Sequence, residues 1–282
     1  MIYFETVSKE GRKSFSPQVT SFPDKTMLIR VPEINSDAEG ICICWKYENE
    51  AELLDLLYLS GNLKDRYPRI PMSLYMPYLP NARMDRVHSA DEVFTLKYFC
   101  NAVNSVGFDK ITVLDAHSNV GTALLGRCEN LSPDRYIGMM LDDCGYDSDK
   151  DFIFFPDEGS CKRYSELPSV KNCKNIGFGI KKRDWATGRI DGLDIFGASP
   201  EGKRVFIIDD ICAYGGTVYH SALKLKETGC TDINVFFTHC ENSIAQGKLF
   251  DEGLLNGIYT TDSICTLDTE EYPLLHKFDC KL

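Results

Sequence analysis

Short apolar runs alternate along the chain with longer segments in which apolar residues recur every three or four positions. The first pattern is typical of buried strands and the second of helices that pack against them. Because the two patterns follow each other in strand–helix–strand order, the sequence predicts an α/β fold with two doubly wound parallel sheets. Expected strands cover residues 26–31, 40–45, 72–77, 110–115, 151–155, 175–180, 204–208 and 233–237, and expected helices cover 49–63, 91–106, 161–167 and 218–228.

A polar and acidic region, residues 130–149, interrupts this alternation. Domain boundaries favour such segments because few buried contacts cross them. We therefore expect two α/β domains, residues 1–135 and 136–282. A chain of 282 residues is long enough for each half to bury a core of its own.

The charge of the chain limits its partners. The formal net charge is −11, whereas a general nucleic-acid-binding protein carries a basic face. No apolar run approaches the roughly 18 residues of a membrane span. Small-molecule substrates are therefore the expected partners, with no nucleic acid and no membrane.

The twelve cysteines are scattered, without a Cys-x-x-Cys pair, and several lie inside apolar runs. A chain of this length needs no disulfides to stabilise its core. We interpret the cysteines as free thiols and expect a cytoplasmic protein.

The strongest local signal is a strand that ends in two acids and leads through a glycine loop into a helix. The apolar run 204–208 is followed by the adjacent carboxylates Asp209 and Asp210. The loop and the start of the next helix then contribute Ala213, Tyr214, Gly215, Gly216 and Thr217. Glycines let backbone N–H groups approach a phosphate, the helix dipole favours an anion, and the acids can bind sugar hydroxyls or a metal. An ordinary turn with an acidic N-cap is the alternative interpretation.

This strand–loop–helix segment resembles the PRPP-binding motif of type I phosphoribosyltransferases and PRPP synthetases. Other segments resemble PRPP synthetases in particular, in the order of that family. They are residues 21–26 (its adenine-binding stretch), 75–86 (its ATP-gripping segment), 113–118 (its Asp-Leu-His segment), 155–159 (its Ser-Pro-Asp-x-Gly segment) and 181–183 (its mobile basic loop). The resemblance implies two domains of the type I phosphoribosyltransferase kind and a homo-oligomer built from dimers.

The same resemblance implies a role for each matching residue. ATP would contact Phe22, Asp24, Arg83, Asp85 and Arg86. His117 and Asp157 would be ligands of Mg²⁺, and the catalytic side chains would be Lys182, Arg183 and His117. The acceptor, a ribose 5-phosphate moiety, would bind to Asp209, Asp210 and residues 213–217.

The residue types suit this chemistry independently of the resemblance. Moving a diphosphate from ATP to a sugar hydroxyl requires cations around the β-phosphoryl group. Lys182 and Arg183 can supply them, although a solvated basic turn is the alternative. His117 follows a strand at a place where a histidine can also be purely structural.

The phosphate loop departs from the family. The family reads Asp-Thr-x-Gly-Thr, whereas this chain has Ala213 and Tyr214 in place of the acid and the hydroxyl. Further departures are Thr26, Met84 and Asp184, which stand where the family has Glu, Gln and Arg. The acceptor is therefore left open between ribose 5-phosphate, which gives PRPP, and ADP-ribose, whose 1-diphosphate could serve NAD synthesis.

Two other functions remain open. A phosphoribosyltransferase would use the same loop to consume PRPP, but it would not need Arg83, Arg86 and His117. A non-catalytic regulatory homologue is the second alternative, against which the basic residues Lys182 and Arg183 argue.

Overall fold

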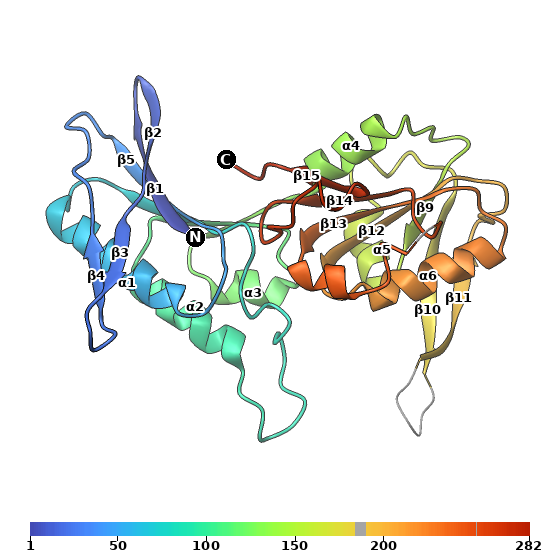
Figure 1. Ribbon diagram of the computed structural model, residues 1–282, viewed down its shortest axis with the longest axis horizontal. Coiled ribbons are helices and arrows are strands. Elements are labelled where there is room, and N and C mark those ends of the chain that lie inside the picture. The colour runs from blue at the N-terminus through green and yellow to red at the C-terminus, as the bar shows by residue number, and fades with distance from the viewer. Residues whose placement is uncertain (184–189, 252) are drawn as a thin grey trace. The chain divides into compact units, whose positions relative to one another are not determined.

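The structure is a computed structural model that describes residues 1–183, 190–251 and 253–282. The chain forms two compact units, an N-terminal unit of residues 1–131 with residue 282 and a C-terminal unit of residues 132–281. Each unit carries its own sheet and its own buried core (Figure 1). The predicted α/β class, with two sheets dominated by parallel strands, is confirmed.

The N-terminal unit is built on a six-stranded sheet in the order β2-β1-β5-β6-β7-β8, with a separate β3–β4 hairpin. Strands β5 to β8 are parallel, whereas β1 runs antiparallel to both of its neighbours. The elements are β1 (Ile2–Ser8), β2 (Gly11–Phe15), β3 (Gln18–Ser21), β4 (Met27–Arg30), β5 (Gly40–Trp45), α1 (Glu52–Arg66), β6 (Met72–Tyr75), α2 (Thr95–Ser105), β7 (Lys110–Leu114), α3 (Asn119–Leu124) and β8 (Cys128–Leu131).

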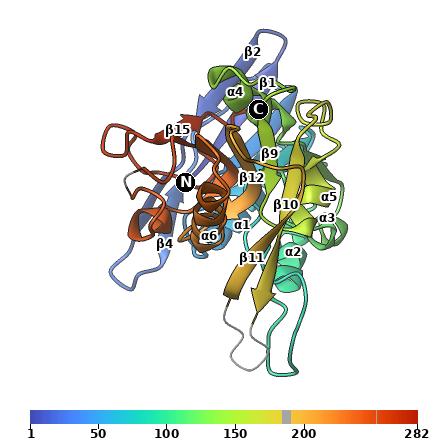
Figure 2. The same ribbon diagram turned by 90° about the vertical axis from the view of Figure 1, so that its right-hand side faces the viewer.

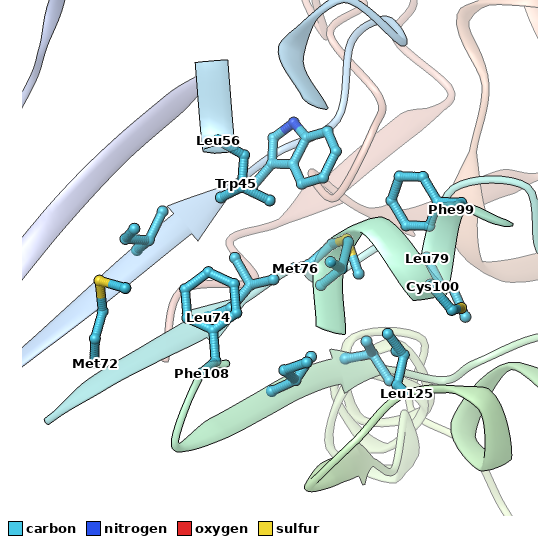
Figure 3. Packing of buried hydrophobic residues seen from close by; sticks show 14 of the residues in the cluster. Trp45, Leu56, Met72, Leu74, Met76, Leu79, Phe99, Cys100, Phe108 and Leu125 are labelled. Carbon is cyan, nitrogen blue, oxygen red and sulfur yellow. The ribbon is translucent and has the colours of Figure 1, made fainter. Parts of the chain in front are cut away.

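One face of this sheet forms the core of the unit. Alternate residues of a strand point to the same face, so Ile41, Ile43 and Trp45 of β5 all reach the core. Apolar residues of α1 and α2, such as Leu56 and Phe99, cover this face at helical spacing. Figure 3 labels Trp45, Leu56 and Phe99 among the buried side chains of this core. The opposite face carries a smaller cluster around Cys42, Cys44 and Tyr75.

The C-terminal unit is built on a seven-stranded sheet in the order β11-β10-β9-β12-β13-β14-β15. All strands are parallel to their neighbours except β11, which pairs antiparallel with β10. The elements are α4 (Asp134–Asp143), β9 (Phe152–Phe155), α5 (Glu158–Tyr164), β10 (Ile176–Arg183), β11 (Ile190–Gly197), β12 (Val205–Cys212), α6 (Gly216–Glu227), β13 (Ile233–Cys240), the 3₁₀ helix η1 (Asn242–Gln246), β14 (Gly257–Thr261) and β15 (Leu275–Phe278).

The strand order of this unit creates a switch point between β9 and β12. From β9 the chain passes through α5 to β10 on one side, and from β12 it passes through α6 to β13 on the other. Helices α5 and α6 accordingly lie on opposite faces of the sheet (Figure 2). In open α/β sheets, ligands bind outside the carboxyl ends of the strands at such a point. The topology thus singles out the ends of β9 and β12.

The expected elements are present, with shifts at their ends. The helix expected over 161–167 spans Glu158–Tyr164 instead, because Asp157 caps it three residues earlier. The strand expected over 204–208 continues to Cys212, so both Asp209 and Asp210 belong to β12. The antiparallel edge strands β1, β2 and β11 were not predicted. Their sequences mix polar and apolar residues because these strands lie at or next to the edge of a sheet.

All twelve cysteines are free, as expected. Within the described ranges, the helices are too short or too polar to traverse a lipid bilayer.

Candidate active site

The carboxyl end of β12 carries the two predicted ribose acids. Asp210 is buried and Asp209 is half-buried, and the Asp210 N–H donates to Asp209 Oδ1 at 3.1 Å. Since side chains alternate along a strand, the two carboxylates leave β12 on opposite faces. Asp209 shares its face with Val205 and Ile207, which pack in the same core as α6. Asp210 therefore points toward the face that α5 covers.

A cation on α5 meets Asp210 on that face. Arg163 Nη1 donates to Asp210 Oδ2 at 2.8 Å and to the hydroxyl of Tyr164 at 3.3 Å. The Asp210 side chain is 9% exposed and that of Arg163 is 30% exposed. Arg163 is not among the residues predicted from the sequence. Its only sequence signal is that a basic residue follows the Pro-Asp-Glu-Gly segment on a short helix, which does not specify a partner.

The loop after β12 is held by its packing and by one residue of unusual conformation. Gly215 has a φ of +75° and caps α6, a position that suits glycine because it has no side chain. A Cβ on Gly215 would overlap Leu249, and a Cβ on Gly247 would overlap the carbonyl oxygen of Tyr214. The backbone of the loop is therefore fixed against the segment after η1.

The side chains and amides of this loop have different surroundings. The Tyr214 ring is 59% exposed, although the backbone of this residue is packed against Gly247. Ala213 precedes it, and Gly216 and Thr217 form the first turn of the twelve-residue helix α6. The first N–H groups of a helix lack intrahelical acceptors and carry a partial positive charge. This end of α6 can therefore bind a phosphate.

The carboxyl end of β9 lies beside that of β12 and carries Asp157. Asp157 is the N-cap of α5: its Oδ1 accepts from the Ser160 N–H at 3.0 Å. The Ser160 hydroxyl lies 3.3 Å from the Asp157 N–H, which completes a capping box. Asp157 thus fixes the first turn of α5, the helix that carries Arg163.

The basic residues Lys182 and Arg183 end β10. Their backbones pair with Gly192 and Ile190 of β11, with an irregularity in register between them. Residues 181–183, expected to form a mobile basic loop, are the end of a strand. Asp184, the other residue noted there, lies outside the described residues.

In the N-terminal unit, the segment before α2 and the end of β7 place several predicted residues near one another. Arg86 Nε donates to Asp85 Oδ1 at 2.8 Å. The pKa of Asp85 lies below its ordinary value, chiefly because of this hydrogen bond, and His117 and Ser118 nearby contribute to the shift. Arg83, in the same segment, is exposed. The structure thus brings Asp85, Arg86 and His117 together.

The backbone at the end of β7 is strained. Asp115 is buried and has a φ of +44°, a left-handed conformation that non-glycine residues rarely adopt. Its N–H donates to the Leu131 carbonyl, and the next N–H donates to the Asn130 side chain at 2.9 Å. Strain of this kind is frequent at functional sites because surrounding contacts must hold it in place. Here it sets the direction in which the chain leaves β7 toward His117.

Phe22 and Asp24 occupy the tip of the β3–β4 hairpin. Phe22 is half exposed, and Asp24 accepts hydrogen bonds from the N–H and the hydroxyl of Thr26 at 3.0 and 2.7 Å. These hydrogen bonds lower the pKa of Asp24. Figures 1 and 2 both draw this tip away from the segment between β6 and α2 that carries Arg83. The N-terminal unit therefore does not gather all the predicted ATP residues in one place.

No family model matches the chain. A ribose-phosphate pyrophosphokinase of Aeropyrum pernix is 29% identical over 234 residues, which cover 81% of this chain and 74% of that protein. A ribose-phosphate pyrophosphokinase of Hyphomonas neptunium is 25% identical, over 88% of this chain and 78% of the other.

Over most of its length this chain is similar to ribose-phosphate pyrophosphokinases. Its fold is that of the phosphoribosylpyrophosphate synthetase from Mycobacterium smegmatis, with a TM-score of 0.74 over 94% of this chain and 86% of the other at 19% identity. The predicted resemblance, fold class and enzyme type, a diphosphotransferase, are confirmed. The roles of individual residues stay predictions.

Proposed function

We propose that the chain transfers the β,γ-diphosphate of Mg²⁺-ATP to the anomeric hydroxyl of a ribose 5-phosphate moiety and releases AMP. One observation carries this proposal. Asp209, Asp210 and the loop 213–217 stand at the carboxyl ends of β9 and β12, the switch point of a sheet in a chain similar to ribose-phosphate pyrophosphokinases. The C-terminal unit would supply the acceptor side of the reaction and the N-terminal unit the ATP side.

On the acceptor side, the loop and the start of α6 would hold the 5-phosphate. Their backbone N–H groups and the helix dipole favour an anion, and the packing of Gly215 and Gly247 keeps the loop in place. Asp209 and Asp210 would accept hydrogen bonds from ribose hydroxyls and so orient the anomeric oxygen. Orientation of the reacting hydroxyl is a major part of catalysis in phosphoryl transfer.

On the ATP side, Arg83 and Arg86 would bind phosphate oxygens, and Phe22 with Asp24 would contact the adenine. Asp85 holds the Arg86 guanidinium at 2.8 Å and so limits the directions in which it can reach. Guanidinium groups suit phosphates because they present parallel donors. The hairpin tip and the arginine segment would contact different parts of the nucleotide.

Mg²⁺ would arrive with ATP. Among the residues that the structure describes, no group of three or more His, Cys, Asp or Glu side chains is arranged to hold a metal. Magnesium in nucleotide sites keeps several waters and phosphate oxygens and takes only one or two protein carboxylates. Asp157 offers a carboxylate oxygen of the required hard type, and His117 stays a proposed ligand or catalytic residue. Bound to the triphosphate, the metal would neutralise charge on the transferring group.

Lys182 and Arg183 would stabilise the negative charge that develops during transfer. Electrostatic stabilisation of this kind typically contributes about 10²–10³ in kcat per donor. We expect Lys182→Ala to lower AMP release by at least that factor, with ATP binding largely kept. Calorimetric ATP titration beside a turnover assay separates the two effects. Turnover retained in this variant would overturn the assigned role.

Two acceptors fit the altered loop. Free ribose 5-phosphate is the acceptor that the names of the relatives suggest. ADP-ribose is favoured by the exposure of Tyr214 and by the small Ala213, because a substituted 5-phosphate needs open space beyond the loop. The exposed ring of Tyr214 could also stack on part of such an acceptor. With ADP-ribose the product would be ADP-ribose 1-diphosphate, which could serve NAD synthesis.

The deciding experiment is AMP release from Mg²⁺-ATP with ribose 5-phosphate and ADP-ribose offered separately. Release with ribose 5-phosphate alone assigns PRPP synthesis, and release with ADP-ribose assigns the second acceptor. No AMP with either acceptor contradicts the proposed activity. PRPP consumption in the presence of a base would then indicate a phosphoribosyltransferase, and its absence a regulatory homologue.

We further propose a cytoplasmic homo-oligomer built from dimers. The free cysteines are compatible with a reducing compartment, and ATP is available there. The oligomeric part of this proposal rests on the resemblance and is tested by light scattering of the purified chain.

A further inference from the structure

The proposed reaction assigns no role to the cation beside the ribose acids, Arg163. We propose that Arg163 is the positioning residue of the acceptor site: it holds Asp210 as an acceptor for a sugar hydroxyl and prevents it from acting as a metal ligand. This inference rests on the proposed function, because it names how the acceptor site distinguishes a sugar from Mg²⁺.

The position of Arg163 is built into the fold. Asp157 caps α5 through Ser160, and the helix places Arg163 over the face of β12 to which Asp210 points. Tyr164, which is 1% exposed, accepts a hydrogen bond from Arg163 Nη1 at 3.3 Å. The guanidinium carbon also lies 5.5 Å from the centroid of the Tyr164 ring. Two contacts to the buried Tyr164 thus fix the guanidinium in the position from which it donates to Asp210.

The charge of the two adjacent acids is the reason why this contact matters. Asp209 and Asp210 together carry two negative charges on consecutive residues, and Arg163 compensates one of them at 2.8 Å. Mg²⁺ is a hard cation that prefers uncompensated anionic oxygens. A carboxylate in an ion pair still accepts a hydrogen bond from a neutral hydroxyl, but it attracts a second cation less. Asp210, with its charge compensated by Arg163, is therefore suited to a ribose hydroxyl.

A second arginine shows what a purely structural pair looks like in the same sheet. Arg204 donates to both oxygens of Asp151 from Nε and Nη2, at 2.9 and 2.6 Å. It also donates to the carbonyls of Cys144 and Gly145, at 2.8 Å each. This pair lies at the amino ends of β9 and β12, away from the switch point. Arg204 is the matched control for Arg163.

The test compares Arg163→Met and Arg163→Lys with the wild type and with Arg204→Met. We expect Arg163→Met to raise the KM of the acceptor about tenfold or more, the usual consequence of losing one charge-assisted hydrogen bond, with a smaller effect on kcat. The optimum Mg²⁺ concentration should change in Arg163→Met because Asp210 becomes a competing metal site. Arg163→Lys should restore part of the KM, and Arg204→Met should leave the acceptor KM and the Mg²⁺ optimum unchanged.

A double mutant separates action through Asp210 from a general structural effect. If Arg163 acts through Asp210, Arg163→Met should add little to the acceptor KM in an Asp210→Asn background. Equal effects of Arg163→Met in both backgrounds, or a loss of kcat with unchanged KM and Mg²⁺ optimum, would overturn the proposal.

A binding measurement keeps this test separate from the proposed activity. Calorimetric titration with ribose 5-phosphate and with ADP-ribose, without ATP, should show at least one acceptor binding about tenfold more weakly to Arg163→Met. Titration with Mn²⁺ in place of Mg²⁺ should show tighter metal binding to the variant. If the wild type releases no AMP, the diphosphokinase function fails, and these titrations still decide the role of Arg163. Unchanged titrations would contradict it, as would a wild type that binds neither acceptor.

Discussion

Two arginine–aspartate pairs stand at opposite ends of the same two strands. Arg204 and Asp151 directly precede β12 and β9, whereas Asp210 lies near the end of β12 and Arg163 follows β9 on α5. In the first pair, two nitrogens of Arg204 donate to the two carboxylate oxygens of Asp151, and the guanidinium also donates to two backbone carbonyls. In the second pair, Arg163 contacts Asp210, the acid that we propose as an acceptor for a sugar hydroxyl. The pair at the amino ends of the strands is thus completed by backbone carbonyls, whereas the pair near the carboxyl ends involves a proposed ligand-binding acid.

An ion pair of the same chemical type can therefore contribute either to the fold or to the site. A buried carboxylate without its partner is strongly destabilising, so both arginines contribute to folding. Only the carboxyl ends of parallel strands at a switch point face a ligand crevice. The two roles are therefore distinguished by where the pair lies in the sheet, more than by the distance between its nitrogen and oxygen atoms.

Breaking the structural pair should have the largest effect on stability. Arg204→Met leaves Asp151, whose side chain is 5% exposed, without this partner, along with the carbonyls of Cys144 and Gly145. We expect the free energy of unfolding to fall by about 2–3 kcal/mol, at or below the low end for buried pairs because the arginine is partly exposed. Urea denaturation measures this loss. Arg163→Met should cost less, and a larger loss in that variant would reverse the comparison.

Adding a side chain at Gly247, which packs against the phosphate loop, should have an intermediate effect on stability. In Gly247→Ala the new Cβ overlaps the Tyr214 carbonyl, so the phosphate loop must move. Overpacking of this kind costs about 1–3 kcal/mol. We expect weaker acceptor binding by calorimetry together with a lower melting temperature.

A glycine in open space provides the control for this variant. Gly61 lies inside α1, and a Cβ there meets nothing within 4 Å. Gly61→Ala should raise stability by about 0.5–1 kcal/mol, because alanine favours a helix more than glycine does. If Gly247→Ala and Gly61→Ala bind the acceptor with the same affinity, the packing of Gly247 against the loop has no consequence for binding.

The exposed pair of the N-terminal unit should give the smallest effect. The pKa of Asp85 is lowered chiefly by Arg86, whose side chain is 70% exposed. Because water solvates the arginine, we expect this pair to contribute less to stability than the Arg204–Asp151 pair. Because the folded pKa is lower than the unfolded value of about 3.9, the contribution is complete above that pH and is lost as the pH falls through the folded pKa.

The pH dependence of one variant tests this assignment. The stability difference between the wild type and Asp85→Asn should be constant from about pH 5 to 8 and should vanish in acid. Denaturant titrations at several pH values measure it. A difference that grows on acidification would contradict the lowered pKa.

Local patterns predicted the elements around the candidate residues but not the tertiary contacts between them. In the run from residue 204 to Thr217 the order of strand, glycine loop and helix agrees with the structure, although β12 continues through both acids to Cys212. Arg163 was missed because its partner is 47 residues away in the chain. The fixed position of Tyr214 was missed for a similar reason, since Gly247 is remote from it in sequence. The resemblance to a mobile basic loop led us to expect a loop at residues 181–183, whereas they continue β10.

The α/β class, the order of the predicted elements and the loop that ends β12 follow from local sequence patterns. These depend on periodicity and turn chemistry, which act over a few residues. Three features emerged from the tertiary structure: β9 and β12 are neighbours at a switch point, Asp210 contacts Arg163, and β1, β2 and β11 add antiparallel strands at the edges. Strand order and ion pairing depend on contacts between residues far apart in the chain, and local propensity does not specify such contacts.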